Sequence, residues 1–117
     1  MLLRTHKLTR RRDIEKLAKT GKGLRSVFFI FKILPNKLEK NRWVIIVSTK
    51  VSKKAVIRNR LRRQVREIIR LNFLDDKMGL DIMVIVKNNA IGVDYKDLEK
   101  DLLFFYEKIK KQKNKTY

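Results

Sequence analysis

The chain has 117 residues, 44% of them hydrophobic, and its 31 basic and 12 acidic side chains give a formal net charge of +19. This length suits a single domain, residues 1–117, with one modest core, and the strong positive charge makes nucleic acid the default partner. The chain has no cysteine, which excludes disulfides and thiolate metal sites, and its only histidine, His6, cannot alone form a zinc site or a Ser/His/Asp triad.

The first half of the chain predicts one short helix and two apolar strands. The helix covers about residues 10–20. Residues 27–34, VFFIFKIL, are typical of a strand, and residues 43–49, WVIIVST, of a strand buried on both faces. We expect these two strands to form an antiparallel hairpin joined through residues 35–42.

The second half predicts a basic helix over about residues 55–74, an apolar strand over residues 81–86, and an amphipathic C-terminal helix. Strand, helix and strand from Trp43 to Val86 form a βαβ unit, so its two strands should be parallel. We therefore expect an α+β two-layer sandwich, with about four strands in a mixed sheet and about three helices. The expected order is α-β-β-(β)-α-β-α.

The helix over residues 55–74 combines one apolar face with one basic face. At 100° per residue, with Ile57 at 0°, five aliphatic side chains fall between about −40° and 80°. These are Ile57, Leu61, Val65, Ile68 and Leu71. Arginines fan through the remaining arc of roughly 100° to 300°, with Asn59 among them. A solvated helix face normally mixes charge signs, because opposite charges four residues apart stabilise it, so this face predicts a polyanion partner.

The distribution of charge along the chain supports this prediction. Residues 1–74 carry 22 basic and 4 acidic side chains, and residues 75–117 carry 9 and 8, which together account for the totals of 31 and 12. Nucleic acid would bind through phosphate contacts that release counterions, so its affinity should fall steeply with salt.

The segment around Arg58-Asn59-Arg60 resembles the helix that carries the R-N-R motif of the bacterial ribonuclease P protein family. The residues that fit the family pattern are Lys50, Ala55, Arg58, Asn59, Arg60, Leu61, Arg62, Arg63, Arg66 and Glu67. The preceding VSTKVSKK is similar to the family's strand end and basic approach, RRRDIEKLAKTGKG to its first helix, and DIMVIVKNNA to its last strand. The resemblance spans nearly the whole chain.

This resemblance implies the protein subunit of ribonuclease P, an endoribonuclease that removes the 5′ leader from precursor tRNA. In the family the RNA subunit is catalytic and holds most of the Mg²⁺, so no catalytic residue, metal ligand or tightly bound cofactor is expected on the protein. The implied partners are ribonuclease P RNA and precursor tRNA, with one monomeric protein per RNA subunit. The family fold also contains a left-handed βαβ crossover, contrary to the usual preference.

The residues expected to bind the RNA core lie on the basic helix and on the approach to it. Guanidinium groups offer forked donors to phosphate oxygens, and Asn59 can pair with a sugar 2′-hydroxyl or a base edge. The expected set is Lys50, Lys53, Lys54, Arg58, Asn59, Arg60, Arg62, Arg63 and Arg66, together with Arg10, Arg11 and Arg12 of the first helix.

The family cleft that contacts the 5′ leader commonly has aromatic side chains on the first helix and the facing strand. This chain departs from that pattern, so its leader contacts should depend more on charge and apolar contact than on base stacking. The cleft residues expected here are Ile14, Ala18, Phe28, Ile30 and Lys32, the last three on one sheet face. Core packing is the alternative for Ile14 and Ala18.

Two other function classes fit a small basic chain. A ribosomal or ribosome-associated RNA-binding protein is the main alternative, and it predicts co-sedimentation with ribosomal subunits. A DNA-binding helix is disfavoured by the all-round arginine fan and by the lack of helix-turn-helix spacing. No apolar run approaches the roughly 20 residues of a membrane span, so we expect no membrane partner and a cytoplasmic location.

Overall fold

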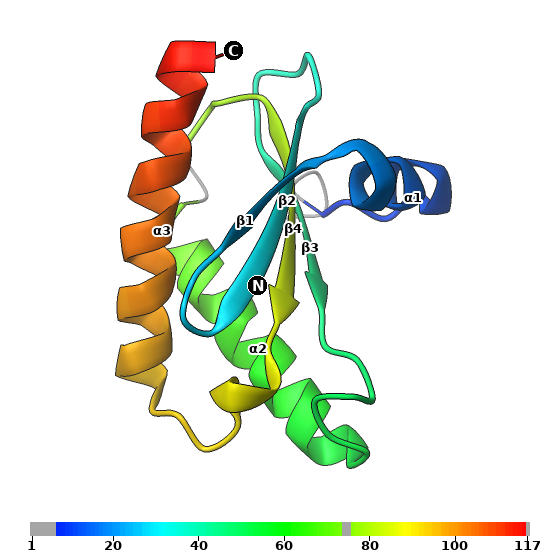
Figure 1. Cartoon of the computed structure of the whole chain (residues 1–117), viewed down its shortest axis with the longest axis vertical. Helices are drawn as coiled ribbons and strands as arrows, with labels where there is room; N and C mark the ends of the chain where they lie inside the picture. Colours follow the sequence, from blue (N-terminus) through cyan, green and yellow to red (C-terminus); the bar gives the residue numbers. More distant parts are fainter. Residues whose placement is uncertain (1–6, 74–75, 117) are drawn as a thin grey trace.

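A computed structural model of the chain describes residues 7–73 and 76–116, with side chains of the last helix described as far as Lys111 (Figure 1). Its elements are α1 (Arg11–Thr20), β1 (Lys22–Arg25), β2 (Phe29–Pro35), β3 (Arg42–Ile46), α2 (Ala55–Asn72), β4 (Leu80–Val86), the 3₁₀ helix η2 (Asn88–Ala90) and α3 (Tyr95–Thr116). Four strands and three α-helices in the order α-β-β-β-α-β-α confirm the predicted α+β class. His6, and the predicted helix end at Leu74, lie outside the described residues.

The strand order is β1-β2-β4-β3, so the predicted hairpin between the strands over residues 27–34 and 43–49, which are β2 and β3 in the structure, is wrong. Strand β4 lies between them, antiparallel to β2 and parallel to β3. Six of its seven residues are buried, and a strand this apolar gains most from a central position with neighbours on both edges. The parallel pairing of β3 and β4 confirms the βαβ unit.

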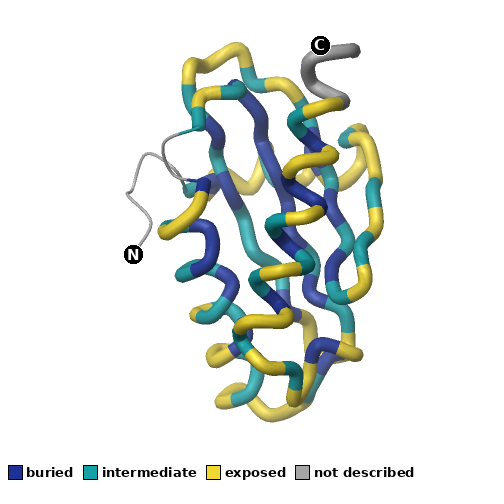
Figure 2. Tube along the Cα trace, turned by 90° about the vertical axis from the view of Figure 1, so that its left-hand side faces the viewer, coloured by how far each residue is buried: buried dark blue, intermediate teal, exposed yellow. Residues whose placement is uncertain are grey.

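The sheet divides the apolar side chains into two layers, because successive strand residues point to opposite faces. Phe29 and Phe31 of β2 belong to the larger core, beneath α2 and α3. Leu17 of α1 and Met83 of β4 belong to a smaller cluster on the other face. Figure 2 shows the buried positions running along the sheet and alternating with exposed positions along the helices. Helix α1 is therefore separated from α2 and α3 by the sheet (Figure 1).

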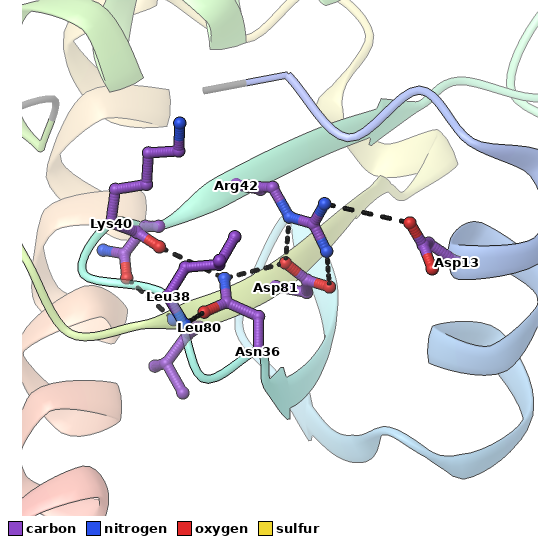
Figure 3. Close-up of polar contacts among 8 residues, drawn as sticks. Asp13, Asn36, Leu38, Lys40, Arg42, Leu80 and Asp81 are labelled. Atoms are coloured by element: carbon purple, nitrogen blue, oxygen red, sulfur yellow. Dashed lines mark hydrogen bonds and ion pairs between the residues drawn. The ribbon is translucent and has the colours of Figure 1, made fainter. Parts of the chain in front are cut away.

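Polar contacts fix the end of the sheet next to α1 (Figure 3). Both carboxylate oxygens of Asp81 accept hydrogen bonds from Arg42, each at 2.8 Å, and Asn36 donates to the same carboxylate at 3.0 Å. The hydrogen bond to Asp81 raises the pKa of Arg42. Asp13 of α1 lies 3.8 Å from the Arg42 guanidinium group, so one arginine links α1 to both β3 and β4.

No helix within the described ranges is long and apolar enough to cross a membrane.

Candidate nucleic-acid interface

Helix α2 buries a face slightly different from the predicted one. Its buried side chains are Leu61, Val65, Ile68 and Ile69. Leu71 is 57% exposed, so its predicted place in the apolar stripe is wrong. At 100° per residue, with Ile57 again at 0°, the buried side chains span about 20° to 120°. The centre of the buried face is therefore rotated by roughly 50° from the centre of the predicted apolar stripe. The rotation follows from packing, because α3 as well as the sheet covers this helix.

The basic face of α2 remains accessible after this rotation. Asn59, Arg60 and Arg63 are exposed, and Arg58, Arg62 and Arg66 are half-buried. Arg58 Nη1 donates to the carbonyl oxygen of Ser52 at 2.8 Å, and Arg62 Nη1 donates to Asn59 Oδ1 at 2.9 Å. A guanidinium group has five N–H donors, so each of these arginines retains donors for phosphate oxygens. Asn59 uses its Oδ1 in that contact and retains its amide NH₂ as a hydrogen-bond donor.

The single acid of α2 is paired with an arginine outside the predicted RNA-binding set. Arg70 donates two hydrogen bonds to the Glu67 carboxylate, at 3.1 and 2.5 Å, and this pairing lowers the pKa of Glu67. Glu67 therefore compensates Arg70, and the remaining arginines of the helix carry uncompensated charge.

The lysines before α2 lie in the connection that leads from β3 into the helix. Lys50, Lys53 and Lys54 are all exposed, and Lys54 occupies the N-cap position. The hydroxyl oxygens of Ser48 and Ser52 accept hydrogen bonds from the backbone N–H groups of Lys50 and Lys54, each at 3.2 Å. These ammonium groups thus lie next to the positive end of the helix dipole, a favourable environment for phosphate.

The three arginines at the start of α1 lie apart from the α2 face. Arg10 occupies the N-cap position without a side-chain capping hydrogen bond, and Arg11 forms an ion pair with Glu15 at 3.0 Å. Helix α1 packs on the opposite face of the sheet from α2. The structure therefore does not bring Arg10, Arg11 and Arg12 into the set formed by the α2 arginines.

One basic residue near this region was not in the predicted set. Lys7 pairs with Trp43 at the edge of β3 and, with Arg62 and Arg66, lines a shallow hollow between that edge and α2. Lys7 lies more than fifty positions before the two arginines in the sequence, so no local pattern could indicate that they line one hollow.

Three of the five predicted leader-cleft residues share the sheet face next to α1. Ile14 is half-buried against the Leu17 and Met83 cluster, and Ile30 and Lys32 point to the same face from β2. Ala18 is exposed on α1. Core packing was the alternative interpretation of Ile14 and Ala18. It holds in part for Ile14, which is half-buried, and it is wrong for Ala18, which is exposed.

Phe28 does not share that face, and its predicted orientation is wrong. It precedes β2, which begins at Phe29, and it packs with the larger core on the α3 side. The physical reason is Asp101 of α3, whose carboxylate accepts hydrogen bonds from the backbone N–H groups of Val27 and Phe28 at 3.3 and 3.0 Å. This contact holds the turn before β2 against α3 and interrupts the strand alternation.

The chemistry that this interface offers is anion binding. Within residues 7–73 and 76–116, no three histidine, aspartate or glutamate side chains gather as a metal-binding group. The dominant arrangement is the row of uncompensated guanidinium groups on α2, and such groups match the geometry of phosphate.

Comparisons with known proteins agree with the fold. A family model described as Ribonuclease P matches residues 2–110. The chain is 38% identical over 101 residues to the ribonuclease P protein component of Clostridioides difficile (strain 630), with 85% of this chain and 87% of the relative covered. It is 40% identical over 103 residues to that of Pseudanabaena sp. (strain PCC 6903), with 87% and 89% covered. Among solved structures it is similar to the RNase P protein from Thermotoga maritima, with a TM-score of 0.76 and 35% identity over 85% of this chain and 93% of that one.

Proposed function

The chain belongs to the ribonuclease P protein family, as the protein component of a tRNA-processing ribonucleoprotein, and we propose that it binds the ribonuclease P RNA through α2. The observation that carries this proposal is the outward face of α2, where Arg60 and Arg63 are exposed while the only acid of the helix is paired with Arg70. Guanidinium groups that have no acidic partner on the protein gain the most binding free energy from contact with a phosphate backbone. Catalysis is assigned to the RNA subunit, together with the Mg²⁺ that the reaction requires.

The second part of the proposal concerns the substrate. The sheet face next to α1 contacts the 5′ leader of precursor tRNA, with Ile30 offering apolar contact and Lys32 a positive charge. The half-buried state of both side chains supports this assignment, because partly covered apolar surface beside a cation suits a single strand. We also propose that one protein acts with each RNA subunit. The cytoplasmic location remains a prediction.

The ribosomal alternative is not favoured. The curated relatives and the similar solved structures are ribonuclease P protein components, and the match extends over most of the chain.

The decisive experiment adds the purified protein to ribonuclease P RNA at low Mg²⁺ and follows cleavage of precursor tRNA. We expect the protein to stimulate cleavage at the mature 5′ end and to have no activity without the RNA. Failure to stimulate, combined with co-sedimentation with ribosomes, would overturn the proposal.

A pair of double variants tests whether α2 is the surface involved. Arg60→Ala/Arg63→Ala should lose most of the stimulation at limiting protein concentration. Lys37→Ala/Lys96→Ala removes the same charge from exposed positions outside α2 and should retain it. Equal loss in the two variants would mean that total charge, and not the α2 face, determines binding.

A further inference from the structure

Phosphate binding by α2 leaves one feature of its surface unexplained. A pocket of about 410 Å³ lies between the first three turns of α2 and the segment over residues 91–95 that leads from η2 into α3. This volume is in the range of small-ligand sites, roughly 300–1,000 Å³. The pocket lies beside the guanidinium face, because Arg60 of the Arg58-Asn59-Arg60 motif is one of the residues that line it.

The pocket has an apolar lining in a strongly basic region of the surface. Ile57 of α2 and Val93 of the facing segment are both half-buried, and Ile91 is 43% exposed. Tyr95, at the start of α3, adds an aromatic ring to the same lining. A surface that served only to attract phosphates would gain nothing from the exposed Ile91, so this lining indicates a ligand with an apolar surface of its own.

The polar groups of the pocket are few and differ in kind. Gln64 lies one helical turn after Arg60 and therefore on the same side of α2. Its amide can both donate and accept hydrogen bonds, and the carboxylate of Asp94 across the pocket can accept them. The guanidinium group of Arg60 can stack on a planar ring or bind a phosphate.

We propose that this pocket receives one unstacked nucleobase of the bound RNA, with the base between α2 and residues 91–95 and its phosphate at Arg60. An apolar, planar ring with hydrogen-bonding edges and an attached anion is the ligand that fits both the lining and the charge. Proteins read single-stranded RNA in this way, by stacking a splayed-out base on aromatic or arginine side chains and pairing with its edges. The inference rests on the proposed function and adds to it a contact that depends on a base.

The first test separates this contact from phosphate binding by its dependence on salt. The variant Gln64→Ala/Ile91→Ala should bind ribonuclease P RNA at least about fivefold more weakly at every salt concentration, because a lost base contact releases no counterions. Leu38→Ala is the control, since Leu38 is 45% exposed and lies in the connection between β2 and β3, outside the set of residues that line the pocket. Wild-type affinity in the pocket variant, or a loss accompanied by a smaller salt slope, would overturn the proposal.

The second test uses wild-type protein and so does not depend on the folding of a variant. Nuclear magnetic resonance spectra would be recorded with adenosine, guanosine, cytidine or uridine 5′-monophosphate, and with ribose 5-phosphate as the probe that lacks a base. We expect at least one nucleotide to shift the Gln64 side-chain amide and the Ile91 methyl signals, and ribose 5-phosphate to leave them unchanged. Equal shifts with ribose 5-phosphate, or no shift with any nucleotide, would exclude a base site.

These outcomes remain distinguishable from failure of the proposed function. If α2 binds RNA through phosphates alone, Arg60→Ala/Arg63→Ala loses affinity and the pocket variant does not. If α2 is not the RNA surface, neither variant loses affinity.

Discussion

Substituting Arg63 with alanine should weaken binding to ribonuclease P RNA by a factor that shrinks as salt rises. Arg63 is exposed on the side of α2 opposite its buried face, and among the described residues no carboxylate forms an ion pair with it. Each phosphate contact adds roughly 0.7 to 0.9 to the slope of log affinity against log salt. Loss of this one side chain should therefore reduce the magnitude of the slope by about that amount.

The size of the effect follows directly from this slope. Between 50 and 200 mM salt the logarithm of the concentration changes by about 0.6, so the defect should be about threefold larger at 50 mM than at 200 mM. The free energy of unfolding should change by less than about 0.5 kcal/mol, because the side chain is exposed. Filter binding over a salt series measures the first quantity, and urea unfolding followed by fluorescence of the buried Trp43 measures the second.

The neighbouring ion pair provides a control on the same helix. Glu67→Gln/Arg70→Gln removes one negative and one positive charge that are hydrogen-bonded to each other, so it should leave the salt slope unchanged. A defect in Arg63→Ala that is the same at both salt concentrations would refute the reasoning, because it would mean that Arg63 displaces no counterions from the RNA.

Three further predictions concern stability. Leu61→Ala should lower the free energy of unfolding by about 2–4 kcal/mol, since Leu61 is 4% exposed, whereas Leu71→Ala should change it by less than about 0.5 kcal/mol. Urea titration of both variants checks that the buried face of α2 is rotated from the predicted apolar stripe. Tyr106→Phe should cost about 1–2 kcal/mol in the same assay, because the buried amide of Asn41 donates to the Tyr106 hydroxyl at 3.0 Å and would lose its acceptor. Burial raises the pKa of Tyr106 above its usual value, so above about pH 10 the unfolded chain loses a proton that the folded chain keeps. The free energy of unfolding should therefore fall as pH rises, and Tyr106→Phe should show a shallower fall in urea titrations between pH 10 and 12.

The elements that could be predicted from the sequence are those whose signals are local. The basic helix was recognisable because its apolar and charged periodicities both occur within residues 55–72. Strand pairing was not recognisable, because the neighbour of a strand is decided by distant residues. Strand β1, KGLR, has a single large apolar side chain and pairs along Ile30 to Ile33 of β2. No pattern within those four residues distinguishes them from a loop.

The candidate interface likewise contains residues that local sequence patterns predict and residues that they do not. The arginines of α2 could be assigned to a common surface because helix geometry alone relates them. Phe28 could not be placed, because its orientation depends on a hydrogen bond to Asp101, 73 residues further along the chain. The pocket beside Arg60 was missed for a related reason, since Gln64 and Ile91 meet only when η2 and α3 fold back along α2. Contacts made between elements carry no periodic signal in the sequence.

The arrangement of α2 also implies that RNA binding and folding support each other. Like charges three or four residues apart on a helix cost a few tenths of a kcal/mol per pair, and the free protein bears this repulsion along the row from Arg58 to Arg66. Burial of Val65 and Ile68 in the core offsets it, at roughly 1.5–3 kcal/mol for each side chain. Packing against the sheet and α3 therefore stabilises the helix, while charge repulsion on its outward face destabilises it when no phosphates are bound. Because a ligand that binds only the folded state stabilises it by mass action, the RNA that this face attracts removes the repulsion that the face creates.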